Sequence, residues 1–146
     1  MRMKGLIVLW LGAFHIIANA ALPRSDWIYY AESDKSGFEI YYSLSSLKKD
    51  GALRTVKIVK NYSEPQKFTA ETPYFVFLSS VETQLINCEK RTYRNTRSEK
   101  WTEHWGGGVL GRAYDYSDKG PNDWSGPIKK TQIEGALMEK VCPEVL

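Results

Sequence analysis

The chain has 146 residues, of which 42% are hydrophobic and 25% are charged, a length that suits one globular domain. Its formal net charge is +3, but residues 1–20 hold Arg2 and Lys4 and no acid, so the rest carries 18 basic against 17 acidic residues, or +1. A nearly neutral domain argues against a general nucleic-acid binder, which needs a clustered excess of positive charge.

The first twenty residues have the pattern of a secretory signal peptide. A basic start, MRMK, precedes the apolar stretch GLIVLWLGAFHIIANA, which ends in Ala18-Asn19-Ala20. We predict cleavage after Ala20, which leaves residues 21–146 as one exported domain. The apolar stretch is short and interrupted for a membrane span, which needs about 20 apolar residues. An uncleaved anchor is therefore the weaker alternative, and we expect no transmembrane segment after cleavage.

The predicted strands follow one another along most of the chain, because aromatic and β-branched residues recur between turn signals. They cover residues 27–33, 37–47, 53–62, 74–88, the stretch 89–101 that runs on from it, and the end of 105–116, beyond three glycines. Turns are predicted at 34–37 and 48–51, and loops at 63–73 and 117–127. The clearest alternation sets Val56 and Ile58 against Thr55 and Lys57.

The hydrophobic period changes near the C-terminus, where we predict a helix. Thr131 and Glu134 form a T-x-x-E capping box, and Pro143 is expected to end the helix. An apolar stripe at i, i+4 and i+8 is formed by Ile133, Leu137 and Val141. The predicted fold class is α+β, with a single antiparallel β-sheet and a C-terminal helix packed on it.

The two cysteines, Cys88 and Cys142, both lie in the exported part. An even count in an oxidising compartment predicts a disulfide, and two cysteines allow only one pairing. The bridge would tie the helix to the sheet and, across so long a loop, stabilise the fold by about 4 kcal/mol. A redox pair is the weaker alternative, because no C-x-x-C motif is present to tune the thiol pKa.

Several of these features occur in a recognisable order. An export signal precedes the block YYSLSSL…DG…VKIVKNYSEPQ, then a strand end LINC followed by basic residues, a glycine-rich turn, and a short helix closing on VC. This order resembles the surface-adhesin protein E family of Gram-negative bacteria, over nearly all of the chain after the signal. The resemblance implies an antiparallel sheet with a C-terminal helix held by Cys88 and Cys142, and binding to host extracellular-matrix and serum glycoproteins.

One feature departs from the family pattern. The adhesin that gives the family its name resembles a lipoprotein, held by a lipidated cysteine just after its signal. Here residues 18–24 read ANAALPR, without a cysteine. We therefore expect a protein exported through the inner membrane, periplasmic or secreted, with no visible lipoprotein anchor.

Patterns for catalysis and metal binding are weak after the signal. The one remaining histidine, His104, adjoins Glu103 before the glycines, but neighbours in a strand face opposite ways, so a polar hairpin tip is favoured over a catalytic pair. The glycines are expected to form a turn and not a phosphate cradle, because no helix start follows them. Metal sites usually need several His or Cys ligands. We expect no enzyme, no cofactor and no metal.

The stretch NCEKRTYRNTRSEKW, residues 87–101, concentrates positive charge among aromatic residues. Alternation in a continuous strand places one group of basic residues on one side, namely Lys90, Arg94 and Lys100. It places a mixed group on the other, namely Arg91, Tyr93, Arg97 and Trp101. Since both sides cannot be core, the stretch either leaves the sheet as an exposed hairpin arm over about 90–112 or bulges near Tyr93. The arm fits the pattern better.

We interpret this arm as a candidate ligand-binding surface. Its residues are Lys90, Arg91, Arg94, Arg97, Lys100, Trp101 and Trp105. Arginines beside aromatics are enriched at interfaces, whereas edge strands also carry charge simply for solubility, and both interpretations stay open.

Three functional hypotheses follow. The first is an exported, non-catalytic protein that docks host matrix or serum glycoproteins through this basic-aromatic hairpin. The second is a soluble periplasmic envelope protein with a structural or assembly role, which forms a homodimer or binds a bacterial partner. The third is an enzyme or inhibitor built on Glu103 and His104.

Overall fold

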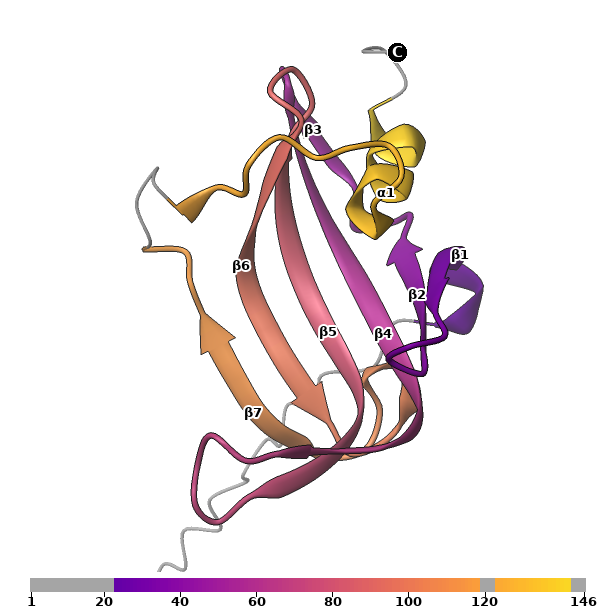
Figure 1. Cartoon of the computed structure of the whole chain (residues 1–146), viewed down its shortest axis with the longest axis vertical. Helices are drawn as coiled ribbons and strands as arrows, with labels where there is room; N and C mark the ends of the chain where they lie inside the picture. The colour runs from indigo at the N-terminus through magenta and orange to yellow at the C-terminus, as the bar shows by residue number, and fades with distance from the viewer. Residues whose placement is uncertain (1–22, 119–122, 143–146) are drawn as a thin grey trace, which may run out of the picture.

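The computed structural model describes residues 23–118 and 123–142 (Figure 1). The elements are the 3-10 turn η1 (Arg24–Asp26), the strands β1 (Trp27–Ser33), β2 (Phe38–Ser43), β3 (Lys48–Asp50), β4 (Leu53–Phe68), β5 (Phe75–Asn87) and β6 (Thr92–Trp101), the 3-10 turn η2 (His104–Gly106), the strand β7 (Leu110–Asp115) and the helix α1 (Ile133–Val141). The strands form one antiparallel sheet in the order β1-β2-β4-β5-β6-β7, with β3 paired to the start of β4. The predicted antiparallel sheet and C-terminal helix are confirmed.

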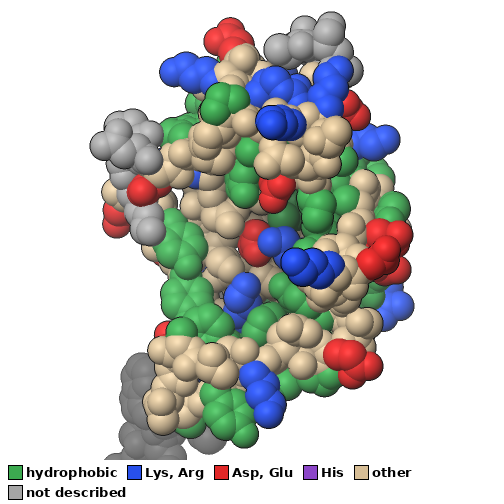
Figure 2. All heavy atoms as spheres, in the orientation of Figure 1, with side chains coloured by type: hydrophobic (Ala, Val, Ile, Leu, Met, Phe, Trp, Pro, Cys, Tyr) green, Lys and Arg blue, Asp and Glu red, His purple; other side chains and the backbone are tan. Residues whose placement is uncertain are grey.

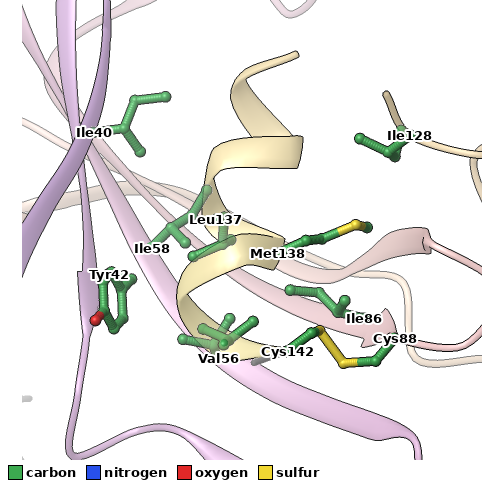
Figure 3. Packing of buried hydrophobic residues seen from close by; sticks show 11 residues of the cluster. Ile40, Tyr42, Val56, Ile58, Ile86, Cys88, Ile128, Leu137, Met138 and Cys142 are labelled. Atoms are coloured by element: carbon green, nitrogen blue, oxygen red, sulfur yellow. A yellow bond between two sulfur atoms is a disulfide. The ribbon is translucent and has the colours of Figure 1, made fainter. Parts of the chain in front are cut away.

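The helix α1 lies across one face of the sheet (Figure 1). Leu137, Met138 and Val141 are each only 1% exposed, and the first two face Ile58 and Ile86 of the sheet (Figure 3). The predicted apolar stripe is therefore confirmed at its last two positions, while Ile133 packs on the edge of this core, partly buried.

The predicted disulfide is confirmed. Cys88, at the end of β5, is bonded to Cys142, with their Cα atoms 5.7 Å apart (Figure 3). The guanidinium Nε of Arg54 in β4 donates to the carbonyl oxygen of Val141 at 3.2 Å. The last turn of α1 is thus fixed to two neighbouring strands.

The start of α1 differs from the prediction. The N-cap is Gln132, with no capping side-chain hydrogen bond, so the T-x-x-E capping box at Thr131 is wrong. The side chain of Gln132 instead accepts a hydrogen bond from the backbone N–H of Lys129 at 2.7 Å, which turns the chain into the helix. Residues 1–20, predicted as the signal, and Pro143, predicted to end the helix, lie outside the described residues.

Two further predictions about strands are wrong. The predicted loop 63–73 is strand over its first part, because β4 continues past a bulge and pairs from Gln66 to Phe68 with β5. The predicted hairpin arm is also absent, because β6 pairs with β5 on one edge and β7 on the other. None of the helices in the described ranges is long and apolar enough to cross a membrane.

Candidate functional site

The predicted site residues of β6 fall on both faces of the sheet. Thr96 is an extra residue between Asn95, which pairs with Gln84, and Arg97, which pairs with Thr83. Because of this bulge, the residues of β6 after Thr96 lie on the opposite face from the one that uninterrupted alternation would give them. A bulge, which was the less favoured alternative near Tyr93, is therefore present three residues farther along. The predicted residues within β6 do not form one surface.

The two tryptophans of the predicted surface are packed on the face opposite the helix. Trp101 is only 9% exposed, and its indole N–H donates to Glu99 at 3.2 Å. The ring of Trp105 lies 4.6 Å from that of Tyr41, between centroids. Neither side chain stands on an exposed arm.

The segment that carries Trp105 folds back over the sheet because Ser79 anchors it. The Ser79 hydroxyl, fully buried, donates to the Glu103 carbonyl oxygen at 2.5 Å and accepts the Gly106 N–H at 3.0 Å. Gly106 has a left-handed φ of +69°, and a Cβ there would meet Val81 at 2.9 Å. Glycine is therefore required for this close approach.

The Glu103–His104 pair takes part in this turn. The Nε2 atom of His104 lies 2.9 Å from the Tyr62 carbonyl oxygen; since a carbonyl only accepts, Nε2 carries the proton. In the described part of the chain, no group of three or more His, Cys, Asp or Glu residues could hold a metal ion. The polar-turn interpretation accounts for both residues.

Lys100 belongs to a half-buried polar cluster on the helix face. Its ammonium donates to the Ser80 hydroxyl at 2.7 Å and lies 5.4 Å from the centre of the Phe77 ring. Nearby, Lys60 is paired with the buried Glu82 at 3.1 Å. Burial lowers the pKa of Lys100, an effect that Glu82 opposes and Lys60 reinforces. Figure 2 shows basic and acidic side chains together in the middle of this face.

Arg94 and Arg97 lie in two other environments. The Arg94 guanidinium lies 5.7 Å from the ring centre of Trp124. Trp124 belongs to a segment that is held beside β6, because the backbone N–H of Ser125 donates to the Tyr93 carbonyl oxygen. Arg97 is paired with Glu99 at 2.6 Å, with 45% of its side chain exposed. Each of the two guanidinium groups therefore already contacts a side chain of the same chain.

Lys90 and Arg91 lie at an end of the sheet where other basic residues gather. This basic end comprises the exposed Lys48, Lys49, Lys90, Lys129, Lys130 and Lys140, together with the half-buried Arg91. Three exposed acids accompany them, namely Asp50, Glu89 and Glu139. Figure 2 shows lysine and arginine side chains gathered over this end of the molecule. Among the exposed side chains, six lysines against three acids give it a local positive charge in a nearly neutral domain.

Distant segments are joined at the basic end by specific contacts. The backbone N–H of Cys88 donates to Ala52 at 2.9 Å, next to the β3–β4 turn. Arg91 and Ile128 exchange two hydrogen bonds, at 2.8 and 3.2 Å. Sequence reasoning missed the five lysines outside the stretch 87–101, although the Lys-Lys pairs at 48–49 and 129–130 were a visible signal.

Comparisons with known proteins agree with this architecture. The chain is similar in fold to the structure of Haemophilus influenzae protein E, with 14% identity over 86% of this chain and 89% of that chain and a TM-score of 0.60. A second crystal form gives 14% identity, coverage of 88% and 96%, and a TM-score of 0.61. The crystal structure of protein E from non-typeable Haemophilus influenzae gives 16% identity over 83% of this chain and 78% of that chain, with a TM-score of 0.55.

In sequence, no curated protein matches the chain. The family model of surface-adhesin protein E matches residues 27–143, which include every strand and the helix. The chain belongs to the surface-adhesin protein E family.

Proposed function

We propose that this chain is an exported, non-catalytic binding protein that docks acidic host matrix or serum glycoproteins through its basic end. Membership in a family named for surface adhesins supports a binding role for an exported or surface protein. The observation that carries the proposal is the excess of six exposed lysines over three exposed acids at one end. A surface of one sign attracts and orients partners of the opposite sign.

The basic end suits binding because it is preorganised. Its lysines come from the β3–β4 region, the β5–β6 turn and the helix region, which the Cys88–Cys142 bond and the Arg91–Ile128 contacts hold together. A surface that is already ordered pays less conformational entropy on binding. The basic end thus replaces the hairpin arm as the proposed docking surface. Of the residues predicted for the arm, only Lys90 and Arg91 belong to the basic end.

Charge reversal tests this proposal. Binding of the processed chain to immobilised heparan sulfate, a sulfated matrix glycan, is measured at increasing salt for K90E/K129E/K130E. A matched control, K35E/K57E/K67E, changes the same charge at exposed lysines elsewhere. We expect the first variant to bind roughly tenfold or more weakly and with less salt dependence, while the control stays within about twofold. Equal losses in the two variants would contradict a localised site.

We retain a second function, a periplasmic envelope protein that acts as a homodimer. It is favoured by β7, which among the described residues pairs only with β6 and leaves its outer edge open. Val109 and Leu110 are exposed there at 69% and 37%, and an open apolar edge can pair with another strand. Light scattering of the processed protein, with Val109→Lys for comparison, decides this: a strict monomer rejects the dimer. Fractionation into periplasm, membrane and medium then locates the protein.

A further inference from the structure

A line of cationic side chains crosses the helix face of the sheet, beyond the part that α1 covers. Lys60 of β4 pairs with Ser80 of β5, and Ser80 pairs with Lys100 of β6. Lys100 in turn pairs with Arg112 of β7. Residues that pair across strands share a face, so these side chains lie side by side on four adjacent strands. Figure 2 shows basic and acidic side chains on the floor of a hollow in the middle of this face. We call Lys60, Lys100 and Arg112 the cationic row.

Apolar rings accompany the cationic row along its length. Each cationic group lies 5.2 to 5.9 Å from the centre of a phenyl ring, in the pairs Lys60–Phe38, Lys100–Phe77 and Arg112–Phe75. Tyr62 connects the first two rings, since its ring centre lies 5.5 Å from those of Phe38 and Phe77. Phe77 is buried, and the other three rings are partly exposed. Positive charge and accessible aromatic surface therefore adjoin on this face, which suits a ligand with one charged end and an apolar body.

Two members of the cationic row already have a carboxylate partner. Lys60 is paired with Glu82 at 3.1 Å, and the guanidinium of Arg112 is paired with Glu71. Lys100, between them in the row, differs from both. Among the residues that the structure describes, no carboxylate forms an ion pair with its ammonium. The middle of the row therefore holds one positive charge without a paired negative charge.

The surroundings of Lys100 make this single charge costly. An ammonium has three N–H donors, and Lys100 directs one of them to the Ser80 hydroxyl at 2.7 Å. Burial lowers the pKa of Lys100, Glu82 opposes this effect, and the positive charge of Lys60 adds to it. A charge that is partly removed from water is stabilised by a counter-charge with hydrogen bonds. Because the side chain of Lys100 is still partly exposed, an anion from solution can supply both.

We propose that the cationic row binds a small monocarboxylate with an apolar body, and that Lys100 receives the carboxylate. The carboxylate accepts charge-assisted hydrogen bonds from Lys100 and relieves the repulsion between Lys100 and Lys60. The apolar body lies on the partly exposed rings of Tyr62 and Phe75. A single negative charge fits, because the row has one cation without a paired acid. This goes beyond the docking of acidic macromolecules at the basic end, since the face, the residues and the size of the ligand all differ.

Titration with hydrocinnamate, a phenyl ring on a short chain that ends in a carboxylate, tests the proposal on the processed, disulfide-bonded chain. Nitrogen–proton NMR spectra give both the dissociation constant and the place of binding. Hydrocinnamyl alcohol lacks the charge, and acetate lacks the apolar body. We expect hydrocinnamate to bind roughly tenfold or more tightly than either reference compound and to shift the backbone amides of Ser80 and Lys100. Equal affinity for the three compounds, or shifts elsewhere only, overturns the proposal.

Matched variants then test the role of Lys100. Lys100→Met removes the ammonium and keeps an apolar stem, and Lys57→Met makes the same change at an exposed lysine on the other face of β4. We expect the first to bind hydrocinnamate roughly tenfold or more weakly and the second to bind it as the unmodified chain does. Equal affinities of the two variants overturn the proposal, and the three compounds on the unmodified chain test it even if Lys100→Met fails to fold. K90E/K129E/K130E should bind hydrocinnamate normally, which separates this proposal from that for the basic end; a loss confined to that variant overturns it.

Discussion

Removing the Cys88–Cys142 bond should weaken the fold by a large fraction of its stability. The bridge spans 54 residues, and the chain-entropy relation for a loop of that length gives about 4 kcal/mol. Net stabilities of domains are about 5–15 kcal/mol, so the loss is severe. Alanine is the suitable replacement in a double variant, because both sulfurs are buried and serine would leave buried hydroxyls without partners.

Urea denaturation of C88A/C142A measures this effect. With a slope of about 1.5 kcal/mol/M, the midpoint should fall by about 2.5–3 M. The variant should keep α1 in place at low denaturant, since Leu137, Met138 and Val141 remain buried against the sheet. A loss below about 1 kcal/mol would refute the view that the covalent tie is a main source of stability.

Three other changes have defined outcomes. Gly135→Ala should destabilise the protein by about 1–3 kcal/mol in thermal unfolding despite the better helix propensity of alanine, because its Cβ would overlap the Lys129 carbonyl oxygen; a gain in stability would contradict this packing. Glu82→Ala should cost about 2–3 kcal/mol, since it leaves the half-buried Lys60 unpaired, and Glu82→Gln should cost less; equal costs would exclude the charge pairing. Burial, and then the charge of Glu82, raise the pKa of Tyr62 to about 12. Because an unfolded tyrosine ionises near pH 10, the folded state is favoured below that pH and the free energy of unfolding should fall between about pH 10 and 12. Alkaline denaturation should show a smaller fall for Tyr62→Phe, and an identical fall would contradict it.

Local patterns in the sequence predicted the elements that obey a simple period. The alternation around Val56 and Ile58 and the stripe ending at Leu137 and Val141 needed no information from distant residues. The disulfide was predictable for a different reason, since two cysteines in an exported chain allow one pairing. These features produced the family resemblance and the correct sheet-and-helix architecture.

The candidate site was predicted poorly because its geometry depends on distant contacts. A single extra residue, Thr96, changes which face each later side chain of β6 occupies, and nothing about a threonine marks a bulge. Trp101 and Trp105 are covered through Ser79 and Gly106, which a local pattern cannot show. The arginine-rich stretch therefore resembled an exposed arm although it is an inner strand.

Charge at the ends of the molecule depends on topology in the same way. Lys48, Lys90 and Lys129 are far apart in sequence, and only the sheet order and the disulfide bring them to one end. The cavity lined by the β1–β2 turn, Asn61 and Trp105 likewise combines segments that are distant in sequence. Only the Lys-Lys pairs at 48–49, in a predicted turn, and at 129–130, before the predicted helix, gave an early sign of the basic end.

The most direct measurement of the central claim is an NMR map of where a sulfated glycan touches the processed protein. Addition of a short heparan sulfate oligosaccharide should shift backbone amides around Lys90, Lys129 and Lys130, and it should leave those of the outer edge of β7 unchanged. Shifts concentrated around Arg97 or along β7, with none at the basic end, would contradict the account.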